Sequence, residues 1–277
     1  MRLWISCVCA ITLLGCSSER GVSIRFQPLL NGQPLRCGTV YTGVGMTQST
    51  FDLLDLKMFI SEATLLDAQG RDTRLSLDQD HTWQRDDIAL LDFEDGTGSC
   101  NTGSPETNTS IRGTVADNDY KAIRFTLGIP AEMNHLDAAT APAPLNEPGM
   151  WWDWTGGYKF MRLDAKTRGN ATYYFHLGAD ACEGTVTGGF SCASGNHTEI
   201  ALGGFDLNDA TISFDVGTLW SGVDLDHQID NATDFIPGCM SDHTDPECTA
   251  MFAELGMSVA GAPSGTQRVF AMAAEAP

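Results

Sequence analysis

The sequence has few basic residues and lacks the short motifs that identify common classes of enzyme. It carries 16 Lys and Arg against 36 Asp and Glu, which gives a formal net charge of −20 at pH 7. A surface of this sign repels nucleic acid, so we expect no nucleic-acid partner. The GxSxG nucleophile elbow, the GxxxxGK[ST] phosphate loop and the HExxH zinc motif are all absent. These absences argue against the enzyme classes that such motifs identify.

No stretch of the sequence is long and apolar enough to cross a membrane, but the first residues have the form of an export signal. Leu3–Leu14 is uncharged and mostly apolar and follows Arg2, as in the hydrophobic region of a signal peptide. This run ends in Leu-Leu-Gly-Cys16, which resembles the lipobox of bacterial lipoproteins. The lipobox implies cleavage before Cys16 and attachment of lipid to that residue.

These features divide the chain into a lipoprotein signal peptide (1–15), a lipidated N-terminal tether (16–22) and a single domain (23–277). The expected location is the periplasm or the cell surface, with a lipid anchor in the membrane. Ser17 and Ser18 follow the lipidated cysteine and favour the outer membrane. The alternative is an ordinary signal peptide that ends near a chance cysteine, and it would also export the protein.

The sequence contains no CxxC pair and no CxxCH motif, which argues against a thiolate metal site and against covalently attached haem. Six cysteines remain after the signal region, and an even number in an oxidising compartment indicates three disulfides. Sequence alone permits fifteen pairings. The short loops suggest Cys182–Cys192 and Cys239–Cys248, which leaves Cys37–Cys100.

Alternating apolar and polar residues predict an all-β fold. Clusters of Gly, Pro, Asn and Asp separate the alternating segments, as expected for an antiparallel β-sandwich or barrel with long loops. Helical patterns are brief and lie near 218–223 and 249–255, and 138–148 is predicted as an exposed loop. The predicted strands lie at 23–26, 56–66 (where a helix is the alternative), 88–93, 120–128, 158–163, 171–177, 199–205 and 211–216.

Three of the six tryptophans lie within four residues, in the segment MWWDWTGGYKF at 150–160. If this segment is extended, Trp152 and Trp154 lie on one face and Trp151 on the other. Tryptophans fill cores by default, and we assign that role to Trp151. An acidic residue within the cluster and two glycines beside it instead favour a site that includes Trp152 and Trp154.

Two of the six histidines are well placed to bind a metal. His135 lies at the predicted end of a strand, and His176 lies within a strand, where alternation puts it on the same face as Tyr174. An imidazole flanked by aromatic residues is partly desolvated, which favours its neutral, metal-binding form. A buried histidine bonded to a backbone carbonyl is an equally good interpretation of His176.

The chain resembles the MbnP-like family, also described as metallo-mystery pair four-cysteine proteins, over nearly all of its mature length. The resemblance rests on several separate blocks of sequence. They are Phe26-x-x-x-x-Asn31-Gly32, Cys37-Gly38, Lys57–Ala63, Leu90–Cys100, Thr107–Gly113, Arg124–Pro130 with Asn134-His135, Trp152-x-Trp154-x-Gly156–Phe160, Phe175–Gly178, Gly238–Ser241 and Asp245-Pro246-x-Cys248.

This resemblance implies an exported β-rich protein that binds copper for sensing, storage or delivery and is not itself an enzyme. It also implies a partner, a di-haem cytochrome c peroxidase-like protein (MbnH-like), that oxidises a tryptophan to kynurenine beside histidine ligands of copper. Reduced copper accepts imidazole donors, which His135 and His176 can supply. Indole donates only an N–H group, whereas kynurenine adds an amine and a carbonyl.

The resemblance does not indicate which tryptophan is modified, so we rank the candidates. Trp154 is favoured as the kynurenine, and Trp152 is second. His81 and Trp83 form a rival pair, because alternation would place them side by side. Met240 is a further soft ligand candidate, although a methionine within a disulfide loop more often contributes packing.

Two other functions remain as alternatives at this stage. A β-sandwich with exposed tryptophans is also suited to bind carbohydrate or another ligand. A hydrolase that uses paired carboxylates is the other alternative, and no motif supports it.

Overall fold

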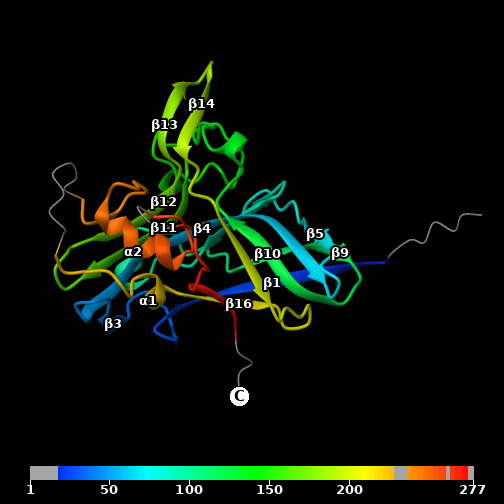
Figure 1. Cartoon of the computed structure of the whole chain (residues 1–277), viewed down its shortest axis with the longest axis horizontal. Coiled ribbons are helices and arrows are strands. Elements are labelled where there is room, and N and C mark those ends of the chain that lie inside the picture. The colour runs from blue at the N-terminus through cyan, green and yellow to red at the C-terminus, as the bar shows by residue number, and fades with distance from the viewer. Residues whose placement is uncertain (1–17, 228–235, 260–262, 274–277) are drawn as a thin grey trace, which may run out of the picture.

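The computed structural model describes residues 18–227, 236–259 and 263–273, and it shows a protein built mainly from β-strands (Figure 1). The predicted signal peptide and Cys16 lie outside the described residues. The strands are β1 Glu19–Leu30, β2 Gln33–Pro34, β3 Val40–Val44, β4 Ser49–Asp67, β5 Asp72–Arg74, β6 Ser76–Leu77, β7 Gln84–Arg85, β8 Ile88–Asp92, β9 Ser110–Ala116, β10 Tyr120–Leu127, β11 Lys159–Thr167, β12 Tyr173–Gly178, β13 Asp180–Thr185, β14 Gly189–Ser194, β15 Thr198–Gly203, β16 Thr211–Asp215, β17 Gly238–Cys239 and β18 Phe270–Met272. The helices are α1 Val216–Leu219 and α2 Pro246–Glu254, with short 3-10 turns η1 Gly98–Cys100, η2 Ala131–Met133 and η3 Pro148–Met150.

Two sheets form the body of the protein. The first has the order β18-β16-β1-β9-β6, and β2 pairs with β1. The second has the order β15-β10-β4-β11-β12-β17, and β3, β5 and β8 also pair with β4. Most neighbouring strands are antiparallel, but β1 pairs with β16 and β12 pairs with β17 in parallel. The predicted sandwich is confirmed, and these two parallel pairs are an addition to it.

The core lies between the two sheets. Phe26 on β1 contacts Phe125 on β10 edge to face at 5.6 Å, and Phe125 also contacts Phe270 on β18 at 5.7 Å. The 19-residue strand β4 crosses the centre of the second sheet and is buried along most of its length. Burial of large apolar side chains is the main force that holds such a sandwich together.

Each predicted strand is present, with different limits. The segment 56–66 is part of the strand β4, so the helical alternative is wrong. Strand β1 begins at Glu19, inside the predicted tether. Helix α2 begins earlier than predicted because the Asp245 side chain accepts a hydrogen bond from the Glu247 N–H and Pro246 occupies the first turn. None of the helices among the described residues is long and apolar enough to span a membrane.

The loop 138–148 differs from the prediction, because part of it packs against the core. Ala138 and Leu145 are buried, and the Leu145 carbonyl accepts a hydrogen bond from the Tyr158 hydroxyl at 2.7 Å. The Ala143 carbonyl accepts a hydrogen bond from Arg85. These contacts fix the segment that leads into the tryptophan cluster.

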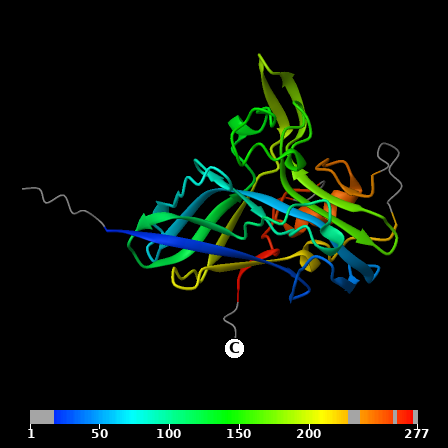
Figure 2. The ribbon, with the colours of Figure 1, turned by 180° about the vertical axis from the view of Figure 1, so that it is seen from behind.

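All three predicted disulfides are present: Cys37–Cys100, Cys182–Cys192 and Cys239–Cys248. The second joins β13 to β14, a separate two-stranded sheet that rises from the body of the protein in both ribbon views (Figures 1 and 2). No residue of these two strands is buried. The β13–β14 hairpin is therefore an exposed projection next to the tryptophan cluster.

Candidate metal centre

The tryptophan-rich segment forms a tight turn rather than an extended strand. Trp151 and Tyr158 make an isolated antiparallel bridge, and the Asp153 carboxylate accepts hydrogen bonds from two backbone N–H groups of the turn. The prediction that Trp152 and Trp154 share one strand face is therefore wrong. An acidic residue in this position is explained by the turn, because aspartate side chains commonly cap such backbone groups.

The three indole rings have different surroundings. Trp154 is 39% exposed, and its ring lies edge to face against Trp151 at 5.8 Å. Trp151 is partly buried, and its indole nitrogen has no hydrogen-bond partner. Trp152 instead packs against the second sheet, where a Cβ on Gly178 would lie 2.5 Å from one of its ring carbons. Gly178 therefore allows the Trp152 ring to lie directly on the end of β12.

Beside Trp152 lies His176, a buried histidine held by a carboxylate. The two ring centroids are 6.3 Å apart, and the ring of Tyr174 packs edge to face on the imidazole at 5.3 Å. The Nε2 atom of His176 lies 2.7 Å from Oδ1 of Asp164 on the neighbouring strand β11. The other carboxylate oxygen, Oδ2, accepts two hydrogen bonds from the Arg162 guanidinium.

These contacts establish the protonation of the pair. Burial lowers the pKa of His176, although Asp164 partly opposes this effect. Burial alone would raise the pKa of Asp164, but the hydrogen bond from His176 and the nearby Arg162 outweigh burial and lower it. A neutral imidazole beside an ionised carboxylate donates its Nε2–H, so Nδ1 carries the free lone pair.

That Nδ1 atom is buried and has no hydrogen-bond partner among the residues that the structure describes. Buried polar atoms are normally hydrogen-bonded, and a ring nitrogen that serves as a metal ligand is one exception. Metal-ligating histidines usually donate their other N–H to a carboxylate or carbonyl, which fixes the ring and raises its basicity. His176 and Asp164 have this arrangement, so the donor set fits a metal ion that prefers nitrogen ligands.

A row of buried polar residues crosses four strands and ends at His176. Asp92 on β8 is opposite Lys57 on β4, Lys57 is opposite Arg162 on β11, and Arg162 is opposite His176 on β12. The Lys57 Nζ atom lies 3.3 Å from Asp92 and also contacts Glu94. Charged groups at this depth require partners, so the row holds its members in fixed positions.

The backbone of Met240 lies next to that of His176. Cys239 pairs with Phe175 in the parallel register of β17 and β12, and the Ser241 hydroxyl donates to the His176 carbonyl at 2.7 Å. Met240 lies between these two residues and is partly buried. Met240 therefore remains a candidate soft ligand for the His176 site.

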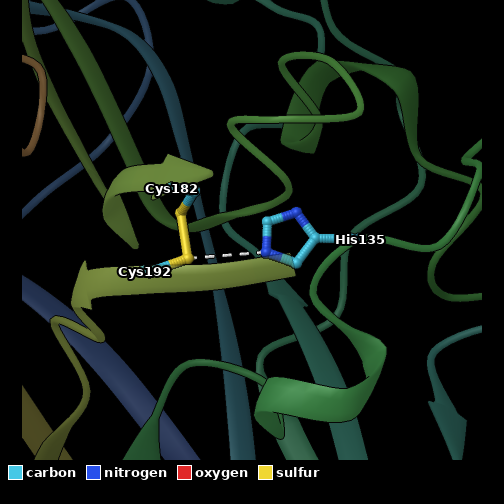
Figure 3. A group of neighbouring side chains, drawn as sticks. All are labelled: His135, Cys182 and Cys192. Atoms are coloured by element: carbon cyan, nitrogen blue, oxygen red, sulfur yellow. Dashed lines mark hydrogen bonds between the residues drawn. A yellow bond between two sulfur atoms is a disulfide. The ribbon is translucent and has the colours of Figure 1, made fainter. Parts of the chain in front are cut away.

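The second predicted histidine occupies a different environment. His135 stacks on Phe190 of the β13–β14 hairpin, with ring centroids 4.4 Å apart. Its Nε2 atom lies 3.5 Å from the sulfur of Cys192, as Figure 3 shows. Within the part of the chain that the structure describes, His135, Cys182 and Cys192 form the only group of three His, Cys, Asp or Glu residues with mutually close ligand atoms.

The comparison with known proteins agrees with the resemblance noted in the sequence. The sequence model of the MbnP family matches residues 19–241. The chain belongs to the MbnP family. The solved structure of MbnP from Methylosinus trichosporium superposes with a TM-score of 0.83 at 27% identity, covering 94% of this chain and 100% of that one. No curated protein matches the chain at a significant level.

For this member of the MbnP family, the structure separates residues that the sequence grouped together. His176 contacts Asp164 and Trp152, whereas His135 contacts the hairpin disulfide and the Trp154 carbonyl. No group of three mutually close histidine, cysteine or carboxylate ligands within the described segments contains both histidines. A site made of two histidines and a tryptophan-derived ligand would not form such a group, so the convergence of His135 and His176 on one ion stays a prediction.

The rival pair is also placed differently from the prediction. His81 is exposed with a φ of 58°, and its backbone N–H donates to the Gln84 carbonyl within a bend. Trp83 is partly buried against the core. The alternation that would place His81 and Trp83 side by side is therefore absent, because the segment is not extended.

Sequence reasoning missed Asp164, which orients the histidine of this MbnP-family protein. The sequence pattern that could have identified it is an alternation of charged and apolar residues in a mostly buried strand. The charged residues are Arg162 and Asp164, and the apolar residues are Met161, Leu163 and Ala165. A charged residue at every second position of such a strand indicates a polar row on one face. The sequence alone does not indicate which strand pairs with this one.

Proposed function

We propose that this protein is an exported lipoprotein that binds copper, for sensing, storage or delivery, at the His176 site. In this proposal a di-haem cytochrome c peroxidase-like partner oxidises Trp152 to kynurenine. The single observation that carries the proposal is the buried Nδ1 of His176, which faces no partner while Asp164 holds Nε2. Membership of the MbnP family supports it.

The donor set suits reduced copper better than harder ions. Imidazole nitrogen and thioether sulfur are donors that monovalent copper accepts, whereas calcium and magnesium prefer oxygen. His176 would supply the nitrogen, and Met240 is placed to supply sulfur if its side chain turns toward the ring. The Asp164 carboxylate would keep the imidazole neutral at Nδ1 and oriented.

The geometry favours Trp152 over Trp154 as the modified residue. The Trp152 ring lies beside His176, whereas Trp154 is the more exposed ring and contacts Trp151. Oxidation to kynurenine would place an amine and a carbonyl next to the imidazole, where indole offers only an N–H. The Trp154 ring, at the surface, is accessible to the partner and would pass an oxidising equivalent inward.

The experiment is to produce the mature chain with and without its di-haem partner and to measure copper and covalent modification. Intact-mass and tandem mass spectrometry locate kynurenine, and metal analysis counts copper per chain. The expected result is stoichiometric copper in the wild type, with kynurenine at position 152. Copper binding is expected to be lost in His176→Gln and weakened in Met240→Leu.

His81→Gln is the matched control, because it removes an exposed imidazole from the rival segment. It is expected to bind as much copper as the wild type. A wild-type chain that holds no copper with or without the partner would overturn the proposal. A glycan affinity that is lost in Trp154→Ala, in a chain that binds no metal, would instead support the carbohydrate-binding alternative.

A further inference from the structure

The residues around the hairpin disulfide form a second ligand group that the proposed copper site does not use. Cys182 and Cys192 lie directly opposite each other on β13 and β14, and His135 approaches them from the loop before the tryptophan cluster (Figure 3). The two sulfurs and one imidazole nitrogen all lie within 4.8 Å of one another. In the disulfide form the sulfurs are bonded to each other and cannot act as thiolate ligands.

The tautomer of His135 is fixed by its neighbours. The Asn134 side-chain oxygen accepts a hydrogen bond from the Tyr158 backbone N–H at 3.0 Å, which turns the amide nitrogen toward His135 Nε2 at 3.3 Å. On the other side of the ring, Nδ1 lies 3.0 Å from the Trp154 carbonyl, which can only accept a hydrogen bond. His135 therefore donates from Nδ1 and accepts at Nε2 from the Asn134 amide, while the Cys192 sulfur lies 3.5 Å from the same nitrogen.

This orientation is the one that metal-ligating histidines use, in which a backbone carbonyl holds one ring nitrogen and the metal binds the other. Stacking on Phe190 further restricts rotation of the ring. An S₂N donor set of two thiolates and one imidazole suits a thiophilic ion such as monovalent copper. The bond between the two sulfurs prevents the group from binding such an ion, and once it is broken the imidazole would exchange the Asn134 hydrogen bond for the metal.

We propose that Cys182, Cys192 and His135 form a redox-gated binding site for monovalent copper, closed as a disulfide and opened by a dithiol. A dithiol thiolate attacks one sulfur, the disulfide bond breaks, and the electron pair leaves on the other cysteine. The second thiol of the reductant then completes its own disulfide, so the reductant is oxidised and both cysteines become thiols. The copper ion replaces the two thiol protons and binds Nε2 of His135.

The position of the hairpin makes it accessible to this reaction. Cys182 and Cys192 are partly exposed in a hairpin without any buried residue. The chain also contains a matched control, the disulfide Cys239–Cys248, which closes a loop of almost the same length. Its sequence separation is 9, against 10 for Cys182–Cys192. Cys239 and Cys248 are both buried in the core, so a reductant reaches them only after the protein opens.

The test is to treat copper-free protein with dithiothreitol without air, remove the reductant, and titrate with monovalent copper against a coloured chelator. Alkylation and peptide mapping identify the reduced cysteines. We expect Cys182 and Cys192 to be reduced before Cys239 and Cys248, and the reduced protein to bind one more copper ion per chain. A Cys182→Ser/Cys192→Ser variant is expected to lose this additional ion.

The His135→Gln variant keeps both sulfurs and tests the imidazole alone. It is expected to be reduced normally and to bind the additional copper at least about tenfold more weakly, since even substitutions behind a ligand cost this much. After reduction, His176→Gln is expected to bind the same one additional copper ion as the wild type. This result separates the proposal from the first copper site. Reduction of Cys182 and Cys192 without additional copper would overturn the inference, as would earlier reduction of the buried control disulfide.

Discussion

The two histidines that the sequence suggested as a pair lie in regions of opposite character. His176 belongs to β12 inside the second sheet, is almost fully buried, and is oriented by a carboxylate. His135 lies in a loop against an exposed hairpin and is oriented by a backbone carbonyl. Among the described residues, Nδ1 of the first ring has no hydrogen-bond partner, whereas Nε2 of the second lies 3.5 Å from a sulfur of a disulfide.

This contrast shows how burial decides what a histidine can do. A buried imidazole is kept neutral and fixed by the strands around it, so its capacity to bind a metal is permanent. An imidazole beside an exposed disulfide has ligands only when the redox state permits. In the two proposals above, similar residue types in one chain therefore supply one constant site and one conditional site.

The largest expected effect concerns the buried row that supports His176. Lys57→Met leaves the carboxylates of Asp92 and Glu94 without their cation in the sheet interior. Removing one partner of a buried ion pair destabilises a protein by about 3–5 kcal/mol. Urea unfolding followed by circular dichroism measures this change in the free energy of unfolding.

Lys121→Met provides the matched control, because Lys121 makes its ion pair with Asp119 at the surface. Exposed pairs of this kind contribute about 0–1 kcal/mol. Equal destabilisation by the two substitutions would show that the buried row does not differ from the surface in its contribution to stability.

The next effect in size concerns the orientation of the His176 ring. Asp164→Asn removes the ionised acceptor of the Nε2–H, so the imidazole can rotate or change tautomer. Second-shell substitutions of this type typically reduce metal affinity about 10–100-fold. Competition with a copper chelator measures the loss, and unfolding experiments determine how much of it reflects stability. An unchanged affinity would show that Asp164 has no role in orienting the ligand.

The buried row also predicts a dependence of stability on pH. Burial raises the pKa of Asp92 to about 7, although the charge of Lys57 opposes this rise. Between about pH 4 and pH 7 the native state holds a proton that the unfolded chain has released. The contribution of Asp92 to the free energy of unfolding should therefore fall as the pH rises through this window, by no more than about 1.4 kcal/mol per pH unit.

Asp92→Asn cannot titrate and should remove that slope, which urea unfolding at several pH values would reveal. The exposed residue Asp119 supplies the control, since Asp119→Asn should leave the slope unchanged. If the wild type and Asp92→Asn instead showed the same dependence of stability on pH, the buried carboxyl would be ionised throughout this range.

The sequence predicted the fold better than it predicted the site. Alternation identified the strands, and the short loops between Cys182 and Cys192 and between Cys239 and Cys248 indicated their disulfides. Both signals are local, so they survive without knowledge of the tertiary structure. The parallel pairing of β1 with β16 depends on residues almost two hundred positions apart and leaves no local pattern.

The candidate site was harder to predict because it depends on a turn and on pairing between strands. Trp152 and Trp154 would share a face only if the segment 150–160 were extended, but Asp153 caps a turn there, and the two rings have different neighbours. Asp164 becomes the partner of His176 only through the register of β11 and β12. Neither feature is visible as a motif, although His176 itself was correctly recognised as a partly desolvated ring.

The smallest expected effect distinguishes the two tryptophans. Trp154→Phe changes an exposed ring and should alter the free energy of unfolding by less than about 0.5 kcal/mol. Copper binding should be unchanged, because the Trp152 ring and His176 are left in place. Kynurenine should still form at position 152. It should form more slowly if Trp154 passes oxidising equivalents inward. Trp152→Phe should abolish both. If tandem mass spectrometry located kynurenine at position 154 in the wild type, the modified residue would lie near His135 and the hairpin. The copper site that does not depend on redox state would then belong to this exposed region.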